Sequence, residues 1–568
     1  MRVLGHCGWL ASQTSSEEGR GELRRIRARG AIGLGLVVVL AVGAIGGWMF
    51  FRSSGGGDEP IVVGTTSTPT ILDPGGAYDA AGAALMSNLY QSLMTYAPGQ
   101  EEPVPDAAES CEFTDNQLTV YRCTLRDDLS FSNGDDVTPD DVKYSYERVL
   151  SMADRAAREA EDDTIPEDEK FAYAGPSSLL ASLEAVRVDG QDVIFELNQP
   201  DATFPLIVAG SAGAIVHRDS YSAIEPETDG QVVGSGPFLL DRYRPNESAE
   251  LVPNPNYRGA VETPDTPVTV RYFVQSDDGT AAEELLADAW EAGELDVNNG
   301  RMPPAVMSDL NRSDSGIRVA ETTGGSIRVL AFNTDQGLPM SEAAARRAAA
   351  SLIDREAISR RVQQGTVEPL YSLIPVGFTG HGTPYYDHYR GVTVDSLRTE
   401  MEEAGLELPV RFNLAYSRGV ANHAEAELIQ QQLEEGGLFD VEISYHDWAE
   451  FIPTIYGARG YDAYLIGWTP DFPDPATFTD TILGPGDGLA TGFSDNAINE
   501  LISRTHGEPD RGRAAEDFLT IHDLAAGSAP IVPIWQDKRT VISTVQISGT
   551  QNLVSHSGVW RLWELHRI

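Results

Sequence analysis

Basic residues and cysteine are scarce in this sequence. Among its 568 residues, 86 are acidic and 41 are basic, so the formal net charge at pH 7 is −45. Only three of the basic residues are lysines, namely Lys143, Lys170 and Lys538. Because so acidic a body repels phosphate backbones, we expect no nucleic-acid partner. Solubility is the simplest role for this charge, and a cation-binding surface is the alternative.

Common catalytic and metal-binding motifs are also missing. The sequence contains no HExxH motif, no Walker loop and no paired CxxC motif, and its histidines show no i,i+4 pair that would supply metal ligands. The stretch Gly234-Ser235-Gly236 resembles part of a nucleophile elbow, but the motif fails because Phe238 stands where the second glycine is needed. We therefore expect a protein that is not an enzyme and that needs neither cofactor nor metal.

The N-terminal region carries the one long apolar run. Residues 31–51 contain no charged residue, and a helix of this length crosses a bilayer. Four arginines between positions 24 and 29 precede it, so the positive-inside rule predicts a basic cytoplasmic tail over 1–30 and a transmembrane anchor over 31–51. Residues 52–60 are then a flexible linker to an extracytoplasmic body, and the protein is a single-pass cell-membrane protein. A cleaved signal peptide is the alternative.

Cysteine is limited to Cys7, Cys111 and Cys123. The last two flank a polar turn, Thr114-Asp115-Asn116-Gln117, between two short β-like runs. Export would bring them into an oxidising compartment, where a disulfide closing this loop would contribute about 3 kcal/mol. We expect the Cys111–Cys123 disulfide, and two reduced thiols are the alternative.

The remaining sequence is that of a globular protein too long for a single core, so at least two lobes are expected. In the first half, Ile61–Thr65 predicts a strand, Ala80–Tyr96 a helix, and the alternation over 186–197 a hairpin that turns at Asp189-Gly190. These elements indicate a mixed α+β lobe.

The second half has the pattern of an α/β lobe. Strand-like alternation over 410–414 is followed by a helical stretch over 421–435, another strand, a helical stretch over 447–457 and a strand over 461–468. An additional helix is predicted over 342–364. Two such lobes favour a binding cleft between them.

One proline-rich loop, residues 467–475, combines Trp468 with Asp471 and Asp474. Three prolines restrict its shape, and a fixed carboxylate beside an aromatic ring suits the capture of a ligand cation. A hydrolase acid/base pair and a solvated surface loop are the alternatives.

This loop resembles the Trp-x-x-Asp-x-x-Asp-Pro segment of family 5 of the bacterial extracellular solute-binding proteins, the oligopeptide- and dipeptide-binding components of ABC transporters. Further segments resemble motifs of that family in the same order: residues 71–74, 88–94, 105–110, 125–134, 233–238 and 254–257. Two positions depart from the family pattern, Gln91 and Cys111. The resemblance covers the chain from about residue 61 to 568.

The resemblance implies a periplasmic-binding-protein-like clamp of two lobes. Lobe I would combine residues 61–105, 225–330 and 530–568, with an inserted subdomain at 106–224, and lobe II would span 331–529. The protein would be a monomer that captures a peptide and delivers it to the permease subunits of an ABC importer. A metal chelate, haem or an oligosaccharide is the alternative solute, and an exported hydrolase is the alternative class.

The same resemblance implies roles for five residues. Asp471 would pair with the α-ammonium group of the peptide, and Trp468 would line the same pocket. Tyr78 and Ala80 lie on a stretch that would offer backbone contacts to the peptide. Trp535 would form an aromatic wall near the hinge.

Overall fold

A computed structural model describes residues 59–97, 102–162, 164–166, 169–173, 175–276, 278–419, 421–553 and 559–568. The chain divides at residue 60, and the fold below is that of the second unit, Pro60–Ile568, which is compact. The predicted tail (1–30), the predicted anchor (31–51) and most of the predicted linker (52–60) lie outside the described residues.

Within the described part of the chain, no helix is both long and apolar enough to cross a membrane.

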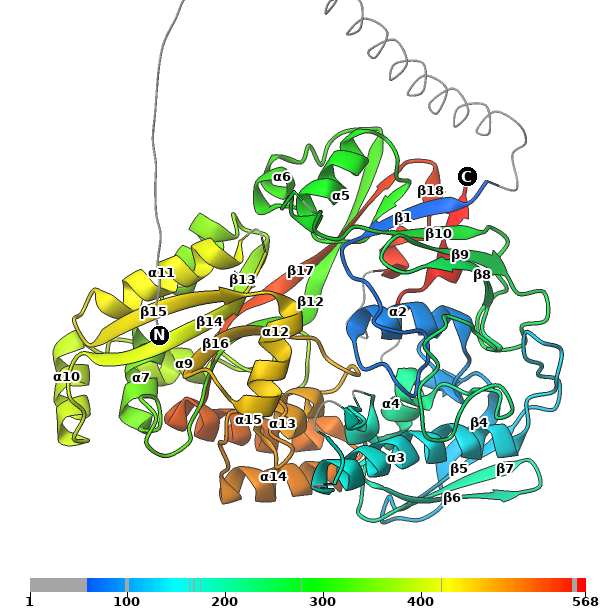
Figure 1. Cartoon of the computed structure of the whole chain (residues 1–568), viewed down its shortest axis with the longest axis horizontal. Helices are drawn as coiled ribbons and strands as arrows, with labels where there is room; N and C mark the ends of the chain where they lie inside the picture. Colours follow the sequence, from blue (N-terminus) through cyan, green and yellow to red (C-terminus); the bar gives the residue numbers. More distant parts are fainter. Residues whose placement is uncertain are drawn as a thin grey trace, which may run out of the picture. The chain divides into compact units, whose positions relative to one another are not determined.

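A single sheet of 11 strands runs through the second unit, in the order β15-β14-β16-β12-β17-β11-β1-β10-β9-β8 with β13 paired to β17. Two long antiparallel strands at its centre, β12 (Ile317–Phe332) and β17 (Ile531–Thr544), connect its two ends (Figure 1). The strands on one side are β1 (Ile61–Thr65), β8 (Phe238–Arg244), β9 (Ser248–Pro253), β10 (Val268–Tyr272) and β11 (Val297–Asn298). We call this side, with helices α2 (Ala80–Leu89), α5 (Ala282–Glu291) and α6 (Pro304–Asp309), the first lobe.

The other side, which we call the second lobe, contains the predicted β-α-β-α-β units. Its strands are β13 (Val367–Pro369), β14 (Val410–Ser417), β15 (Phe439–His446) and β16 (Ala463–Trp468). Its helices are α7 (Ala343–Leu352), α8 (Arg355–Ala357), α9 (Pro384–Tyr389), α10 (Val394–Glu403), α11 (Asn422–Glu434), α12 (Trp448–Pro453), α13 (Ala476–Leu483), α14 (Asn496–His506) and α15 (Arg511–Ser528). Strand β14 pairs in parallel with both β15 and β16, so the predicted α/β pattern is confirmed.

A separate sheet of four strands, in the order β4-β5-β7-β6, forms the body of what we call the subdomain. Its elements are β4 (Ala108–Phe113), β5 (Val120–Leu125), the 23-residue helix α3 (Pro139–Glu161), β6 (Leu183–Asp189), β7 (Asp192–Leu197) and α4 (Phe204–Val208). The predicted hairpin is confirmed as β6 and β7, and Gly190 at its turn has a φ of +66° that favours glycine. The residue boundaries of the lobes and the subdomain remain a prediction.

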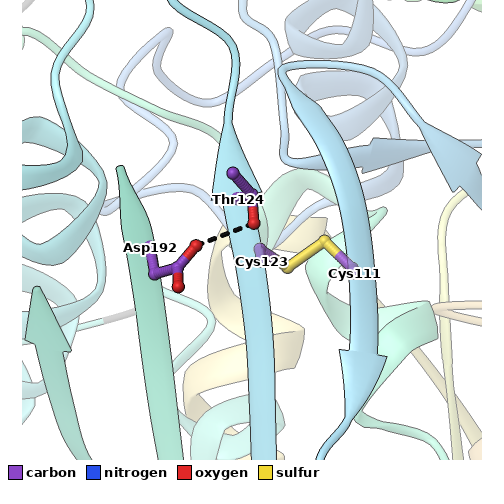
Figure 2. The surroundings of a disulfide bond; sticks show 4 residues. All are labelled: Cys111, Cys123, Thr124 and Asp192. Atoms are coloured by element: carbon purple, nitrogen blue, oxygen red, sulfur yellow. Dashed lines mark hydrogen bonds between the residues drawn. A yellow bond between two sulfur atoms is a disulfide. The ribbon is translucent and has the colours of Figure 1, made fainter. Parts of the chain in front are cut away.

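Cys111 and Cys123 lie directly opposite each other on β4 and β5 and form a disulfide (Figure 2). On the other side of β5, the Thr124 hydroxyl donates a 2.7 Å hydrogen bond to Asp192 of β7. Cys123 is fully buried, and the disulfide therefore joins the edge strand β4 to the core of the subdomain.

Two predicted helices are shorter in the structure than in the sequence-based assignment. The helix predicted over 80–96 ends at Leu89, because Tyr90 is extended and the chain continues into strand β2 (Met94–Thr95). The helix predicted over 342–364 is broken at Ile353, whose extended backbone lets Asp354 cap the next short helix by accepting from the Ala357 N–H. Apolar spacing gave no sign of either interruption.

Candidate functional site

The parallel strands of the second lobe end along one edge of the sheet. Ser417 at the end of β14 lies opposite His446 at the end of β15, and Leu465 of β16 lies beside Tyr416. Because ligands of open α/β sheets bind beyond the carboxyl ends of parallel strands, the loops that follow these strands are the candidate site. They carry Arg418, Trp448 and the predicted segment Trp468–Asp474.

Asp474 fixes the shape of the loop that follows β16. Its carboxylate is 3% exposed, accepts two hydrogen bonds of 2.7 Å from Arg511, and accepts a third from the Ala476 N–H at the start of α13. Phe472 and Ala476 pack into the hydrophobic core of the subdomain. Asp474 is thus held by the protein itself, and the loop bridges the second lobe and the subdomain.

Asp471 is held differently, because it contacts no cation. One carboxylate oxygen accepts a 2.8 Å hydrogen bond from the Tyr78 hydroxyl, and the other accepts a 3.1 Å bond from the Thr477 hydroxyl. No positively charged side chain in the described part of the chain forms an ion pair with it. Burial raises the pKa of Asp471 to about 6, and the two hydroxyl donors only partly offset that rise. At neutral pH the site therefore holds a negative charge that no cation among the described residues compensates.

Tyr78 reaches Asp471 from a segment of the first lobe that is fixed on both sides. Before it, the buried Asp73 carboxylate forms a bidentate ion pair with Arg148 of α3, with distances of 2.7 and 2.8 Å. After it, Asp79 caps α2 by accepting from the Gly82 N–H at 2.7 Å. Burial, and then the Asp471 carboxylate, raise the pKa of Tyr78 above its ordinary value, so its hydroxyl remains a donor.

The predicted residue Ala80 is exposed and is the first residue of α2, two positions after Tyr78. It lies close in sequence to the Tyr78–Asp471 contact, and its predicted role in binding stays a prediction.

Aromatic side chains lie along the same sheet edge. Trp468 is partly buried, and its indole N–H has no hydrogen-bond partner among the described residues. Tyr445 is 59% exposed and Trp448 is 61% exposed. The guanidinium group of Arg418 lies 5.1 Å from the centre of the Tyr445 ring and pairs with Asp447 at 3.1 Å. Sequence reasoning did not select Arg418, Tyr445 or Trp448. Their positions at the end of a strand or directly after one were a usable signal.

Trp535 lies in the core of the second lobe. It is 5% exposed, and its indole N–H donates a 2.5 Å hydrogen bond to Glu425, which also pairs with Arg328 at 3.0 Å. The guanidinium group of Arg301 lies 5.2 Å from the centre of its ring. The described contacts of Trp535 do not include Asp471, and its predicted role as a wall residue stays a prediction.

Among the residues that the structure describes, no group of three or more His, Cys, Asp or Glu side chains is arranged to hold a metal ion.

Comparison with known proteins identifies the family. The model for bacterial extracellular solute-binding proteins, family 5 Middle, matches residues 102–489, which is more than half of the chain. The chain belongs to this family. The solute-binding protein is also 23% identical to the dipeptide-binding protein DppE of Bacillus subtilis over 508 residues, which cover 87% of this chain and 89% of that protein.

Solved structures show the same fold. The periplasmic binding protein DppA from Helicobacter pylori, in complex with peptide STSA, matches with a TM-score of 0.76 and 19% identity over 90% of this chain and 98% of that one. AgaA from A. tumefaciens, in complex with agropinic acid, matches with a TM-score of 0.74 and 20% identity over 90% and 99% of the two chains. The predicted two-lobed, mixed α/β fold of a periplasmic binding protein is thereby confirmed.

These relatives correct the predicted location. The Helicobacter pylori protein is named as a periplasmic binding protein, and the family is one of extracellular solute-binding proteins. These findings contradict the predicted single-pass location in the cell membrane.

Proposed function

We propose that this solute-binding protein captures peptides with a free N-terminus and delivers them to the permease subunits of an ABC importer. The main support for this proposal is that the Asp471 carboxylate has no cationic partner among the described residues. A ligand ammonium group would be a suitable counter-ion for it. An ammonium group desolvated beside this carboxylate gains a charge-assisted hydrogen bond that water would otherwise screen. The names of the relatives that bind dipeptides and oligopeptides support the proposal.

In this proposal, the ligand ammonium joins Tyr78 and Thr477 around the Asp471 carboxylate. Trp468, with its unpaired indole N–H, lies three residues earlier and lines the same pocket. The stretch that contains Tyr78 and Ala80 belongs to the other lobe, so a bound peptide would contact both lobes and favour their closed arrangement. The exposed rings of Tyr445 and Trp448 offer apolar contact to peptide side chains.

A non-peptide solute is the second candidate, and one observation favours it. AgaA, which has the same fold, was solved in complex with agropinic acid. Titration with a free-N-terminus tripeptide and with haem, a nickel chelate and an oligosaccharide distinguishes the candidates.

We also propose that the protein is not an enzyme. A hydrolase that used Asp471 and Asp474 would need both carboxylates free, whereas Asp474 is buried in a bidentate pair with Arg511. Mass spectrometry of peptides incubated with the protein tests this point, and any specific cleavage would contradict it.

The deciding experiment is calorimetric titration of the full-length protein with trialanine and with N-acetyl-trialanine. We expect Asp471→Asn to weaken trialanine binding by at least 100-fold and to leave the weak binding of the acetylated peptide unchanged. Asp128→Asn, a change at an exposed carboxylate of the subdomain, is the matched control and is expected to change neither. An equal loss for both peptides in Asp471→Asn would remove the basis for the ammonium role.

A further inference from the structure

A cavity lies beside the two long central strands. Its volume is about 190 Å³, and its walls come from both lobes: α6 with the loop before it, the turn at 364–367, and the strands β12 and β17. The Ser308 hydroxyl of the first lobe donates a 3.0 Å hydrogen bond to the Gln364 side chain of the second lobe at this place. We call this cavity the hinge pocket.

The hinge pocket is rich in cations, in contrast to the rest of the protein. Acidic residues outnumber basic ones by 86 to 41 in the whole chain, but its lining contains four basic and two acidic residues. They are Arg301, Arg312, Lys538 and Arg539, against Glu321 and Asp537.

Two of these cations are already neutralised. Arg312 pairs with Glu321 at 2.7 Å, and Lys538 pairs with Glu368 at 2.7 Å. Arg301 and Arg539 form no ion pair with any carboxylate in the described part of the chain. Arg301 stacks on the Trp535 ring, and Arg539 donates a 2.6 Å hydrogen bond to the amide oxygen of Asn299.

Asp537 is the one carboxylate of the pocket that could oppose an anion. Its side chain accepts a 3.0 Å hydrogen bond from the Ser326 N–H, and it is not within ion-pair distance of either free arginine. Burial raises the pKa of Asp537, and Arg539 and Arg301 act in the opposite direction. Burial also lowers the pKa of Arg539, as expected of a desolvated cation that lacks a close counter-ion. Arg301 and Arg539 together with Asp537 therefore give the pocket a net positive charge.

We propose that the hinge pocket binds an oxyanion, a carboxylate or a phosphate, between the guanidinium groups of Arg301 and Arg539. Guanidinium groups bind both kinds of oxyanion with two parallel hydrogen bonds. The hydroxyl groups of Thr366 and Thr540 in the lining already donate, to the Gln363 carbonyl and to Glu321, so the two guanidinium groups supply the donors for the anion. A volume of about 190 Å³ is small for an organic ligand and sufficient for such a group with water.

An anion in the hinge pocket would contact both lobes. Its binding would therefore favour one angle between the lobes over others. Because solute binding also depends on that angle, the anion would change the affinity for the solute. This proposal does not depend on Asp471, and it can hold even where the proposed ammonium role of that residue fails.

Calorimetric titration of the full-length protein with sodium phosphate, against sodium chloride at equal ionic strength, tests the site. We expect saturable phosphate binding that is weakened at least tenfold by Arg301→Gln and by Arg539→Gln. Arg242→Gln, at an exposed arginine of β8, is the control and is expected to bind phosphate as the wild type does. Because Arg301 is exposed, its variant is expected to fold even where Arg539→Gln does not. A wild type that does not distinguish phosphate from chloride, or an Arg301→Gln variant with unchanged binding, would overturn the proposal.

A second arm identifies the source of the oxyanion. If the pocket holds the carboxylate of the transported solute, phosphate competes with trialanine, and trialanine amide binds more weakly to the wild type but not to Arg301→Gln. If it holds a free anion, phosphate and trialanine bind together. Asp471→Asn leaves phosphate binding intact in either case, which separates this test from that of peptide binding.

Discussion

The hydroxyl group of Tyr78 donates a 2.8 Å hydrogen bond to Asp471, which lies 393 positions later in the chain. This bond joins the first lobe to the loop at the sheet edge of the second lobe. It also gives a partly buried carboxylate a neutral partner, and no cation among the described residues pairs with that carboxylate. The two residues therefore allow separate tests of charge, hydrogen bonding and lobe contact.

Peptide affinity is expected to depend on pH through Asp471. Its pKa is about 6 without ligand, and only the ionised form pairs with an ammonium group. We expect the affinity for trialanine to be constant above pH 7 and to fall by up to tenfold for each pH unit below about 6. Calorimetry between pH 4.5 and 8 measures this, and a flat profile would contradict it. Asp471→Asn provides the control without a titrating group.

The same carboxylate is expected to lower the stability of the unliganded protein at high pH. A pKa raised in the folded state means that folding favours the protonated form, so the cost of ionised Asp471 is absent below the unfolded-state pKa of about 4, grows as pH rises, and is complete above about 6. Asp471→Asn should therefore stabilise the free protein by roughly 1–3 kcal/mol at pH 8 and by about a third of that at pH 4.5. Urea unfolding at the two pH values measures the difference. Equal effects at both would show that packing, not charge, is responsible.

Tyr78→Phe tests the hydrogen bond alone. The Tyr78 hydroxyl lowers the pKa of Asp471, so its removal should raise that pKa further. We expect the pH at which half of the peptide affinity is lost to move upward, with a stability change of about 1 kcal/mol or less. The measurement is the pH series used for the wild type. A downward shift of the midpoint would be inconsistent with the hydroxyl acting as donor to the carboxylate.

His506 forms a charged contact between the second lobe and the subdomain. Its Nε2 lies 2.7 Å from Asp480, and its Nδ1 lies 3.5 Å from Asp201 of the subdomain. Burial lowers the pKa of His506, but the two carboxylates outweigh burial and raise that pKa to about 10. The resulting stability is fully present below about pH 6.5 and is lost as pH rises through about 10.

His506→Gln should therefore reduce the free energy of unfolding at pH 7 by about 3 kcal/mol, since it leaves two carboxylates without their cation. Chemical unfolding at pH 7 and at pH 10.5 checks this, because the variant and the wild type should converge at the higher pH. His566→Gln, at a more exposed histidine near Asp265, is the matched control and should change stability by less than about 1 kcal/mol. If the loss of stability at pH 7 persisted at pH 10.5, it would show that the packing of His506, and not its charge, is responsible.

Replacing both Cys111 and Cys123 by serine should destabilise the subdomain by about 3 kcal/mol, since the disulfide restricts the unfolded chain. Peptide affinity should change little, because the partners of the Asp471 carboxylate, Tyr78 and Thr477, do not lie on this hairpin. Thermal unfolding and calorimetry of the double variant measure the two quantities. A loss of peptide affinity with unchanged stability would contradict the prediction that the disulfide stabilises the fold and has no role in binding.

Local patterns predicted the hairpin at Gly190, the strand at Ile61 and the α/β succession after Val410, because alternation and turn residues act over a few positions. The same patterns missed the ends of two helices, where Tyr90 and Ile353 adopt extended backbone that the surrounding chain imposes. Family resemblance selected Asp471 and Trp468. It could not show that Tyr78 reaches Asp471 with its side chain, nor that Trp535 donates to the buried Glu425, since both contacts join residues more than 100 positions apart.

The ladder between β12 and β17 extends across both lobes, with register shifts between Thr323 and Ile327 and between Arg328 and Val329. A regularly paired ribbon resists bending, so a change of angle between the lobes is concentrated where pairing is interrupted. Ser326, in the first interruption, bonds to Asp537 of the hinge pocket and to Thr469, two residues before Asp471. The interruption in the β12–β17 pairing therefore lies within a few residues of both proposed ligand sites. A ligand bound at either site would contact the segment at which we expect the angle between the lobes to change.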